Sequence, residues 1–255
     1  MLLAIDIGNT SISCGIFDSD KLVHKFRFPS DKYCSIAEYK KKINENTKEY
    51  KISDCVIASV VDELTGIIKQ AAYELYIIEA LVISSSIDLG FKLNIESPET
   101  AGADRIANTA AARQMYPLPA IIIDLGTATT FDIVDKNGNF IGGIIMPGLK
   151  IQLDSLNQKT SKLPLAEISL PQKIIGKNTI DSMLSGVVRG HVNAIEQLLK
   201  DCTAELGDNP TVIATGGYTE IISQCMRNKF DYTNQNLTLE GMKIIYKHCK
   251  TKLKQ

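Results

Sequence analysis

The sequence predicts an α/β protein made of two similar halves, each a mixed sheet with flanking helices. Short apolar runs rich in β-branched residues alternate with longer segments of helical periodicity, which is typical of this fold class. The order of these segments in residues 1–117 repeats in residues 118–255, so we expect two duplicated domains with these bounds. Each half also opens with a strand that ends in an Asp-x-Gly turn, at Asp6 and at Asp124.

The first half begins with three predicted strands. They lie at 2–7, 12–17 and 22–28, because the apolar runs there are separated by polar turns that contain Gly, Asn and Asp. A polar helix near 35–50 and a strand at 55–60 follow. Apolar residues from Leu64 to Leu75 recur at helical spacing, which predicts an amphipathic helix, and a strand at 80–84 completes this half.

The second half repeats this order. Strands are predicted at 120–125, 129–134 and 140–145, a long helix at 180–200, a strand at 211–214, and helices near 219–229 and 239–250. The join is expected near 116–119, where two prolines interrupt any helix. The weak periodicity of residues 147–178 predicts an inserted segment that is mobile or functional.

Charge and cysteine content narrow the classes of partner. Lys and Arg total 28 against 29 for Asp and Glu, a net charge of −1, so we expect neither a nucleic-acid nor a membrane partner. The first residues lack the basic region of a signal peptide, and no apolar run is long enough to span a bilayer. Six scattered cysteines without a CxxC pair predict reduced thiols and a cytoplasmic location.

The turn after the first strand has a composition suited to phosphate. Gly8 lets the backbone approach an anion, and successive N–H groups form an anion-binding concavity. Asn9, Thr10 and Ser11 add neutral donors, and the Asp6 carboxylate suits magnesium or its waters. A plain hairpin turn is the alternative, since Asn and Gly are common in turns. Because a second such loop opens the other half, the pair favours phosphate binding.

Other segments also have two interpretations. In Gly102-Ala103-Asp104-Arg105, a carboxylate can take a proton from an alcohol while the arginine holds an anion, or Asp104 simply complements a helix dipole. Thr215-Gly216-Gly217 is either bare backbone against which an adenine ring can lie or a tight strand-to-helix turn. His191 lies on an apolar helical stripe, so we predict a packed core histidine, not a ligand.

Together these motifs resemble those of the type III pantothenate kinases, within the acetate kinase, sugar kinase, Hsp70 and actin superfamily. The resemblance covers nearly the whole chain and implies two actin-like (ribonuclease H-like) domains. It rests on Asp6-Ile7-Gly8-Asn9-Thr10, Gly102-Ala103-Asp104-Arg105-Ile106-Ala107-Asn108, Ile123-Asp124-Leu125-Gly126-Thr127-Ala128-Thr129-Thr130, Gly142-Gly143-Ile144-Ile145-Met146-Pro147-Gly148, Leu163-Pro164, Gly176-Lys177-Asn178-Thr179 and Thr215-Gly216-Gly217. The second and third of these segments are the most specific.

The resemblance implies ATP-dependent phosphorylation of pantothenate to 4′-phosphopantothenate, the first step of coenzyme A biosynthesis. Asp104 is the implied catalytic residue, which deprotonates or orients the primary hydroxyl of pantothenate. The implied ATP-binding residues are Asp6, Ile7, Gly8, Asn9, Thr10, Ser11, Ile12, Ser13 and Thr127. The implied substrate-binding residues are Gly102, Ala103, Asp104, Arg105, Thr179 and Ile95, the last standing where many members have a tyrosine.

Ions and partners follow from the same resemblance. Asp124 matches the family's ligand for a monovalent cation, K⁺ or NH₄⁺, and Mg²⁺ would accompany ATP, with Asp6 as its partner through water. The family works as a homodimer whose pocket includes the partner subunit, and ATP would bind between the halves. Two alternatives remain open, a kinase for another small alcohol or sugar on the same fold and a non-catalytic nucleotide-binding regulatory paralogue.

Overall fold

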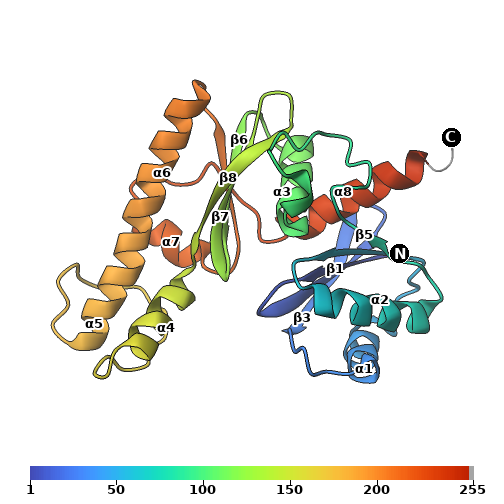
Figure 1. The fold of residues 1–255 in the computed structure, drawn as a ribbon, viewed down its shortest axis with the longest axis horizontal. Helices are drawn as coiled ribbons and strands as arrows, with labels where there is room; N and C mark the ends of the chain where they lie inside the picture. The colour runs from blue at the N-terminus through green and yellow to red at the C-terminus, as the bar shows by residue number, and fades with distance from the viewer. Residues whose placement is uncertain (253–255) are drawn as a thin grey trace. The chain divides into compact units, whose positions relative to one another are not determined.

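The computed structural model describes residues 1–252, which form two compact units (Figure 1). The first unit contains Met1–Tyr116, Gly138–Ile141 and the C-terminal residues from Asn236. The second contains Pro117–Asn137 and Gly142–Gln235. The break at Tyr116 coincides with the expected join, whereas the C-terminal helix groups with the first unit instead of the second half. Among the described residues, no helix has the length and apolar character needed to cross a membrane.

The first unit is built on a five-stranded sheet in the order β3-β2-β1-β4-β5. Its strands are β1 (Leu2–Ile7), β2 (Ser11–Asp18), β3 (Lys21–Pro29), β4 (Asp54–Ser59) and β5 (Leu81–Val82). The strand β1 is antiparallel to β2 and parallel to β4, so it lies at the centre of the sheet. The predicted strands are all present, although β5 is shorter than expected.

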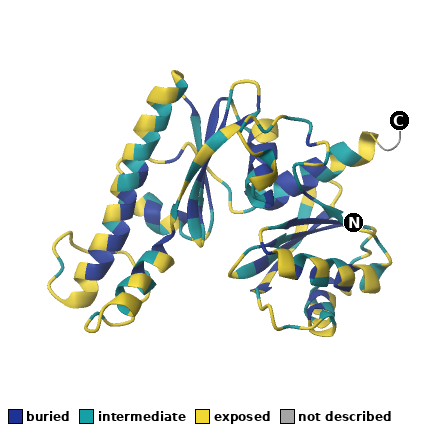
Figure 2. Cartoon of the chain, in the orientation of Figure 1, coloured by how far each residue is buried: buried dark blue, intermediate teal, exposed yellow. Residues whose placement is uncertain are grey.

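Alternation along β1 assigns helices to the two faces of this sheet. Leu3, Ile5 and Ile7 pack in one core with α1 (Ile36–Thr47) and α2 (Asp62–Tyr76). Leu2 and Ala4 point the other way and pack with α3 (Ala103–Met115) and α8 (Leu237–Lys252). A single-turn 3₁₀ helix at Pro98–Thr100 precedes α3. Figure 2 shows the strands and inner helix faces as the buried parts of the unit.

The packing of α8 on α3 explains why the last helix belongs to the first unit. A Cβ added at Gly241 of α8 would lie 1.8 Å from the carbonyl oxygen of Ala107, so only glycine permits this close crossing. Met242 and Ile245 are fully buried in the same core. The amphipathic pattern predicted a helix at 239–250 but carries no information about which sheet the helix covers.

The second unit repeats the sheet, with strand order β10-β9-β6-β7-β8. Its strands are β6 (Ala120–Leu125), β7 (Ala128–Val134), β8 (Phe140–Pro147), β9 (Thr211–Thr215) and β10 (Tyr232–Thr233). As in the first unit, the central strand is antiparallel to the strand that follows it and parallel to its other neighbour. The first two residues of β8, Phe140 and Ile141, are counted with the first unit. The predicted duplicated α/β fold is therefore confirmed.

The helices of the second unit differ from the prediction in two places. The unit contains α4 (Leu149–Lys159), α5 (Thr179–Leu184), a π-helical turn (Ser185–Arg189), α6 (Gly190–Leu206) and α7 (Thr219–Cys225). The predicted long helix is thus continuous from Thr179 to Leu206 but contains a π turn. The helix α4 lies in the weakly periodic 147–178 segment and was missed, because only Leu149 and Leu153 of this helix are fully buried.

Candidate active site

The first of the two predicted phosphate loops is a tight connection of residues 8–10 between β1 and β2. The Gly8 N–H donates to the carbonyl of Ser11 at 3.1 Å. From the end of β3, Ser30 holds the loop twice, through Oγ to the Gly8 carbonyl at 2.5 Å and through its N–H to the Thr10 carbonyl at 3.1 Å. The side chains of Asn9 and Thr10 are left exposed. The loop is therefore rigidly held while its tip faces solvent.

The residues that support this loop were not among those predicted from the sequence. Besides Ser30, Arg27 on β3 donates from Nε to the Ser11 hydroxyl at 2.7 Å. Neither residue belongs to a recognisable motif. The sequence predicted β2 and β3 as consecutive strands, and their pairing puts Pro29 opposite Ser11. This pairing is the one sequence feature that brings Ser30 and Arg27 close to the loop.

Asp6 lies on the α3 and α8 side of the sheet. It pairs across the sheet with Ser13 and Ala58, and alternation places its side chain on the same face as Leu2 and Ala4. Its carboxylate is partly buried near the carboxyl end of β1. In open α/β sheets, ligands bind at this end of the parallel strands.

Asp104 is located at the same end of this sheet, in the first turn of α3. Its Oδ1 accepts the N–H of Arg105 at 2.8 Å. A Cβ at the N-cap residue Gly102 would lie 2.5 Å from that oxygen and 3.4 Å from Cγ1 of Val60. Val60 directly follows β4, and its N–H donates to the carbonyl of Ile7 at 3.1 Å. The Asp104 carboxylate thus lies beside the edge from which the first phosphate loop emerges.

The environment of Asp104 changes its acidity. Burial raises the pKa of this carboxyl above its usual range, and the N–H and positive charge of Arg105 oppose the effect only in part. A raised pKa makes the carboxylate a better proton acceptor. The predicted alternative, a simple helix start, is also present, because Asp104 occupies the first turn of α3.

The Arg105 side chain lies over an aromatic ring. Its guanidinium carbon is 5.1 Å from the centroid of Phe140, which belongs to the first unit. Phe140 is fixed by backbone bonds to Lys92 at 3.0 Å and to Asn94 at 2.8 Å. Ile95 follows Asn94 directly and is partly buried. The segment that carries Ile95 is therefore tied to the strand whose ring stacks on Arg105.

The second phosphate loop joins β6 to β7 through residues 126 and 127, one residue fewer than the first loop. The Gly126 N–H donates to the Ala128 carbonyl at 3.1 Å, which repeats the Gly8 contact. The carbonyl of Thr127 accepts the N–H of Gly148 at 3.1 Å, and Thr127 is exposed. Each loop is thus closed by a bond from its glycine N–H to the carbonyl of the first residue of the following strand.

Asp124 lies against the glycine turn that follows β9. Gly216 has a φ of +92°, and a Cβ there would lie 2.6 Å from Asp124 Oδ1 and from the backbone of Leu125. The N–H of Tyr218 donates to the Leu125 carbonyl at 3.1 Å. The predicted turn at Thr215-Gly216-Gly217 is therefore confirmed, and the structure brings it to Asp124. Its contact with adenine stays a prediction.

Thr179 is the first residue of α5 and is exposed. Its N-cap, Asn178, accepts the N–H of Asp181 at 2.8 Å through its side chain. A Cβ at Gly176 would lie 2.3 Å from the backbone nitrogen of Ser182, so this glycine packs directly on the helix. The Gly-Lys-Asn-Thr segment is thus a helix-start structure in the second unit, whereas Gly102, Ala103, Asp104 and Arg105 belong to the first.

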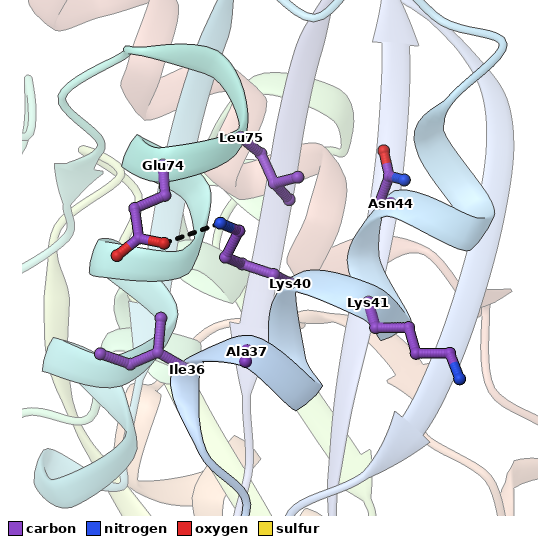
Figure 3. A pocket seen from close by; sticks show the side chains of 7 residues that line it. All are labelled: Ile36, Ala37, Lys40, Lys41, Asn44, Glu74 and Leu75. Atoms are coloured by element: carbon purple, nitrogen blue, oxygen red, sulfur yellow. Dashed lines mark hydrogen bonds and ion pairs between the residues drawn. The ribbon is translucent and has the colours of Figure 1, made fainter.

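In the part of the chain that the structure describes, neither a metal cluster nor the groove between α1 and α2 coincides with these residues. Over residues 1–252 there is no group of three or more His, Cys, Asp or Glu side chains that could hold a metal. A groove of about 610 Å³ lies between α1 and α2, on the sheet face opposite Asp6, where Lys40 pairs with Glu74 at 2.8 Å (Figure 3). The groove contains none of the predicted site residues.

Sequence comparisons relate the chain to one family of kinases. Residues 2–201 match the family model of the type III pantothenate kinases. The type III pantothenate kinase of Geobacter sulfurreducens is 39% identical over 251 residues, which cover 96% of this chain and 98% of that protein. That of Dehalococcoides mccartyi strain 195 is 38% identical over 250 residues, 96% of each chain.

Solved structures support the fold. A protein assigned to the Baf family of transcriptional activators from Campylobacter jejuni superposes with a TM-score of 0.61, at 21% identity and 98% coverage of this chain and 99% of its own. Component A of the Acidaminococcus fermentans (R)-2-hydroxyglutaryl-CoA dehydratase gives 0.57 at 14% identity, with 100% and 99% coverage. At such identities the likeness concerns the fold alone. By its sequence matches over nearly its whole length, this chain belongs to the type III pantothenate kinase family.

Proposed function

We propose that Asp104 is the catalytic residue of this pantothenate kinase, which transfers the γ-phosphoryl group of ATP to pantothenate and so opens coenzyme A biosynthesis. The observation that carries the assignment is the position of the Asp104 carboxylate. It lies in the first turn of α3, beside Val60 and the edge of β1 and β4 from which the first phosphate loop emerges.

The chemistry of Asp104 follows from this environment. Because burial raises its pKa, the ionised carboxylate accepts the proton of the pantothenate hydroxyl more readily than an exposed aspartate does. The hydroxyl oxygen bonds to the γ-phosphorus as the bond to the ADP oxygen breaks. Since phosphoryl transfer depends mainly on positioning and charge, Asp104 acts chiefly by orienting the hydroxyl.

Substrate binding is assigned to the residues around Asp104. The Arg105 guanidinium, stacked on Phe140, is a suitable partner for the pantothenate carboxylate. Gly102, Ala103 and Ile95 are the other proposed substrate contacts in the first unit, and Thr179 is the proposed substrate contact in the second. The aliphatic side chain of Ile95 makes a nonpolar contact there in place of a hydroxyl.

Nucleotide phosphates are assigned to residues 6–13 and Thr127. The fixed backbone and exposed tip of the first loop suit an anion, and Thr127 offers an exposed hydroxyl. Magnesium is usually held by one or two carboxylates, with waters and substrate phosphates as the other ligands. The single carboxylate of Asp6 suits a magnesium ion that arrives with ATP, because water and the phosphates supply its other ligands. Bound there, it would neutralise charge on the phosphates.

Asp124 is assigned to a monovalent cation, K⁺ or NH₄⁺. The support is its partly buried carboxylate, which lies against the backbone of the Gly216 turn. Carboxylate and carbonyl oxygens are suitable ligands for such cations. The assignment is tested by the dependence of turnover on K⁺.

A homodimer is the proposed assembly. Apolar side chains on the second unit are exposed in the single chain, with Leu165 at 70%, Ile174 at 66% and Ile175 at 71%. A cavity of about 510 Å³ beside α5 is lined by Ile174, Ile175 and Arg189 among others. Exposed apolar patches of this kind are typical of protein interfaces. All six cysteines are free thiols, which suits the proposed cytoplasmic location.

The test of this function is production of 4′-phosphopantothenate from ATP and pantothenate, with Mg²⁺ and with or without K⁺. A panel of hexoses and other small alcohols provides the control for substrate class. We expect pantothenate to be the preferred acceptor and Asp104→Asn to abolish most of the turnover. Phosphorylation of a hexose in preference to pantothenate, or full turnover by Asp104→Asn, would contradict the assignment.

A further inference from the structure

His191 on α6 is buried and bonded through both ring nitrogens. It is 2% exposed, which confirms the predicted packed core histidine. Its Nε2 lies 2.9 Å from the hydroxyl of Thr129, and its Nδ1 lies 2.8 Å from Nε2 of Gln152. Thr129 itself is 1% exposed and lies in β7, two residues after the exposed Thr127 of the second phosphate loop.

The hydrogen positions in this network have one solution. The side-chain amide of Gln152 also lies 2.8 Å from the carbonyl oxygen of Pro147, which can only accept a hydrogen bond. The group facing both partners is therefore the NH₂, so Nδ1 of His191 accepts and Nε2 carries the hydrogen that is donated to Thr129. Burial lowers the pKa of His191 to about 4, which keeps the ring neutral and preserves this arrangement at neutral pH.

Backbone bonds close the network into a ring around the second phosphate loop. The Gln152 N–H donates to the Gly148 carbonyl at 3.1 Å, and the Gly148 N–H donates to the Thr127 carbonyl at 3.1 Å. A Cβ at Gly148 would lie 2.3 Å from the Thr127 oxygen, so this contact requires glycine. The ring thus runs from Thr127 through Gly148, Gln152 and His191 to Thr129.

The helix that supplies His191 is built irregularly at this point. A π turn at Ser185–Arg189 ends one residue before Gly190, the first residue of α6. Such turns occur frequently at functional sites, because they change the direction in which later side chains point. Val188 and Ile195, on the same side of the helix as His191, are fully buried.

We propose that His191 is a positioning residue for ATP, which fixes the second phosphate loop through Thr129 and Gln152 without touching the nucleotide. The inference rests on the proposed assignment of Thr127 to a nucleotide phosphate. A loop held at both ends presents Thr127 in one conformation, so the nucleotide does not have to order the loop when it binds. If these hydrogen bonds are broken, the free energy needed to order the loop weakens the binding of ATP.

The experiment measures binding of a non-hydrolysable ATP analogue with Mg²⁺ to the full chain by calorimetry, in the absence of pantothenate. His191→Leu and Thr129→Val each remove the side-chain link and are expected to weaken binding about tenfold, the effect of one buried hydrogen bond. The double variant is expected to be no weaker than either single one, because both break the same ring. His191→Gln keeps a donor near the Nε2 position and is expected to lose less than threefold.

Ile195→Val provides the matched control, since it trims a buried residue one turn further along α6 and leaves the ring intact. It is expected to bind the analogue as the wild-type chain does, and KM for pantothenate is expected to stay unchanged in all variants. The proposal is overturned if folded His191→Leu binds the analogue normally, or if Ile195→Val weakens binding equally. Because nucleotide binding is measured alone, a wild-type chain that binds the analogue but does not phosphorylate pantothenate refutes the proposed function and leaves this test valid.

Discussion

Replacing Gly102 with alanine tests whether the position of the Asp104 carboxylate limits turnover. The backbone of Gly102, with φ −58° and ψ 137°, is allowed for any residue, so alanine introduces no backbone strain. The added Cβ would nevertheless lie 2.5 Å from Asp104 Oδ1, whereas ordinary contact begins at 3.4 Å. The carboxylate therefore has to move by about 1 Å, while its charge and its chemistry remain.

The expected cost follows from this displacement. A misplacement of about 1 Å lowers turnover on the order of 10²-fold, or about 2.7 kcal/mol of activation free energy. Alanine stabilises the fold by restricting the unfolded chain, and it destabilises the fold by weakening the hydrogen bond from the Arg105 N–H to Asp104. Because these two effects oppose each other, the free energy of unfolding is expected to change by less than about 1 kcal/mol. The variant should thus be a stable protein with a low kcat.

The assay compares kcat, both KM values and Tm for wild type, Gly102→Ala and a control. Gly66→Ala is the matched control, because Gly66 is exposed on α2 of the same unit and an added Cβ would meet nothing within 4 Å. It is expected to keep wild-type kcat and to gain about 0.5–1 kcal/mol of stability from better helix propensity. Gly102→Ala with kcat within threefold of wild type would refute the positional role of this contact.

Three other predictions concern acidity, the cation and assembly. Asp104→Asn is expected to lower kcat about 10²–10⁴-fold. Burial raises the pKa of Asp104 in the folded state above its value in the unfolded chain, so the stability of the wild-type protein falls as pH rises between these two values. The neutral side chain in Asp104→Asn avoids this loss and is expected to raise Tm at pH 7. Below about pH 3.9 Asp104 is protonated in both states, and the difference in Tm between variant and wild type is expected to vanish. Asp124→Asn is expected to remove the stimulation of turnover by K⁺, measured by comparing K⁺ with Na⁺. The Tm of this variant without K⁺ is expected to equal that of the wild-type chain. Ile175→Asp, at a side chain 71% exposed, is expected to give a folded monomer in sedimentation analysis, and an unchanged dimer would argue against this interface.

Most of the candidate site was visible as local sequence patterns. The two loops after Asp6 and Asp124 are strand–turn–strand segments, in which the turn residues and the flanking apolar runs are neighbours in the chain. The Gly102 to Arg105 segment was equally visible, but not its environment. Its proximity to Val60 depends on how α3 lies on β4, which no local pattern encodes.

The supporting contacts could not be predicted for the same reason. Ser30 and Arg27 hold the first loop from another strand, and His191 reaches the second loop from a helix about sixty residues further along the chain. A serine at a strand end or a histidine on an apolar stripe has the same local pattern whether or not it supports a site. The π turn before His191 was likewise not visible, because the apolar stripe that predicted the helix continues through residues 185–189 without a break.

The sequence by itself determined the duplicated α/β architecture, the family and the two strand–turn–strand loops, because these depend on periodicity and on turn residues that are adjacent in the chain. Only the tertiary structure decided that α8 returns to the first sheet, where Gly241 permits its close approach to Ala107. It also decided which residues hold each loop. Such contacts join residues far apart in the chain and are selected by packing and hydrogen-bond satisfaction across a whole unit, which no local pattern records.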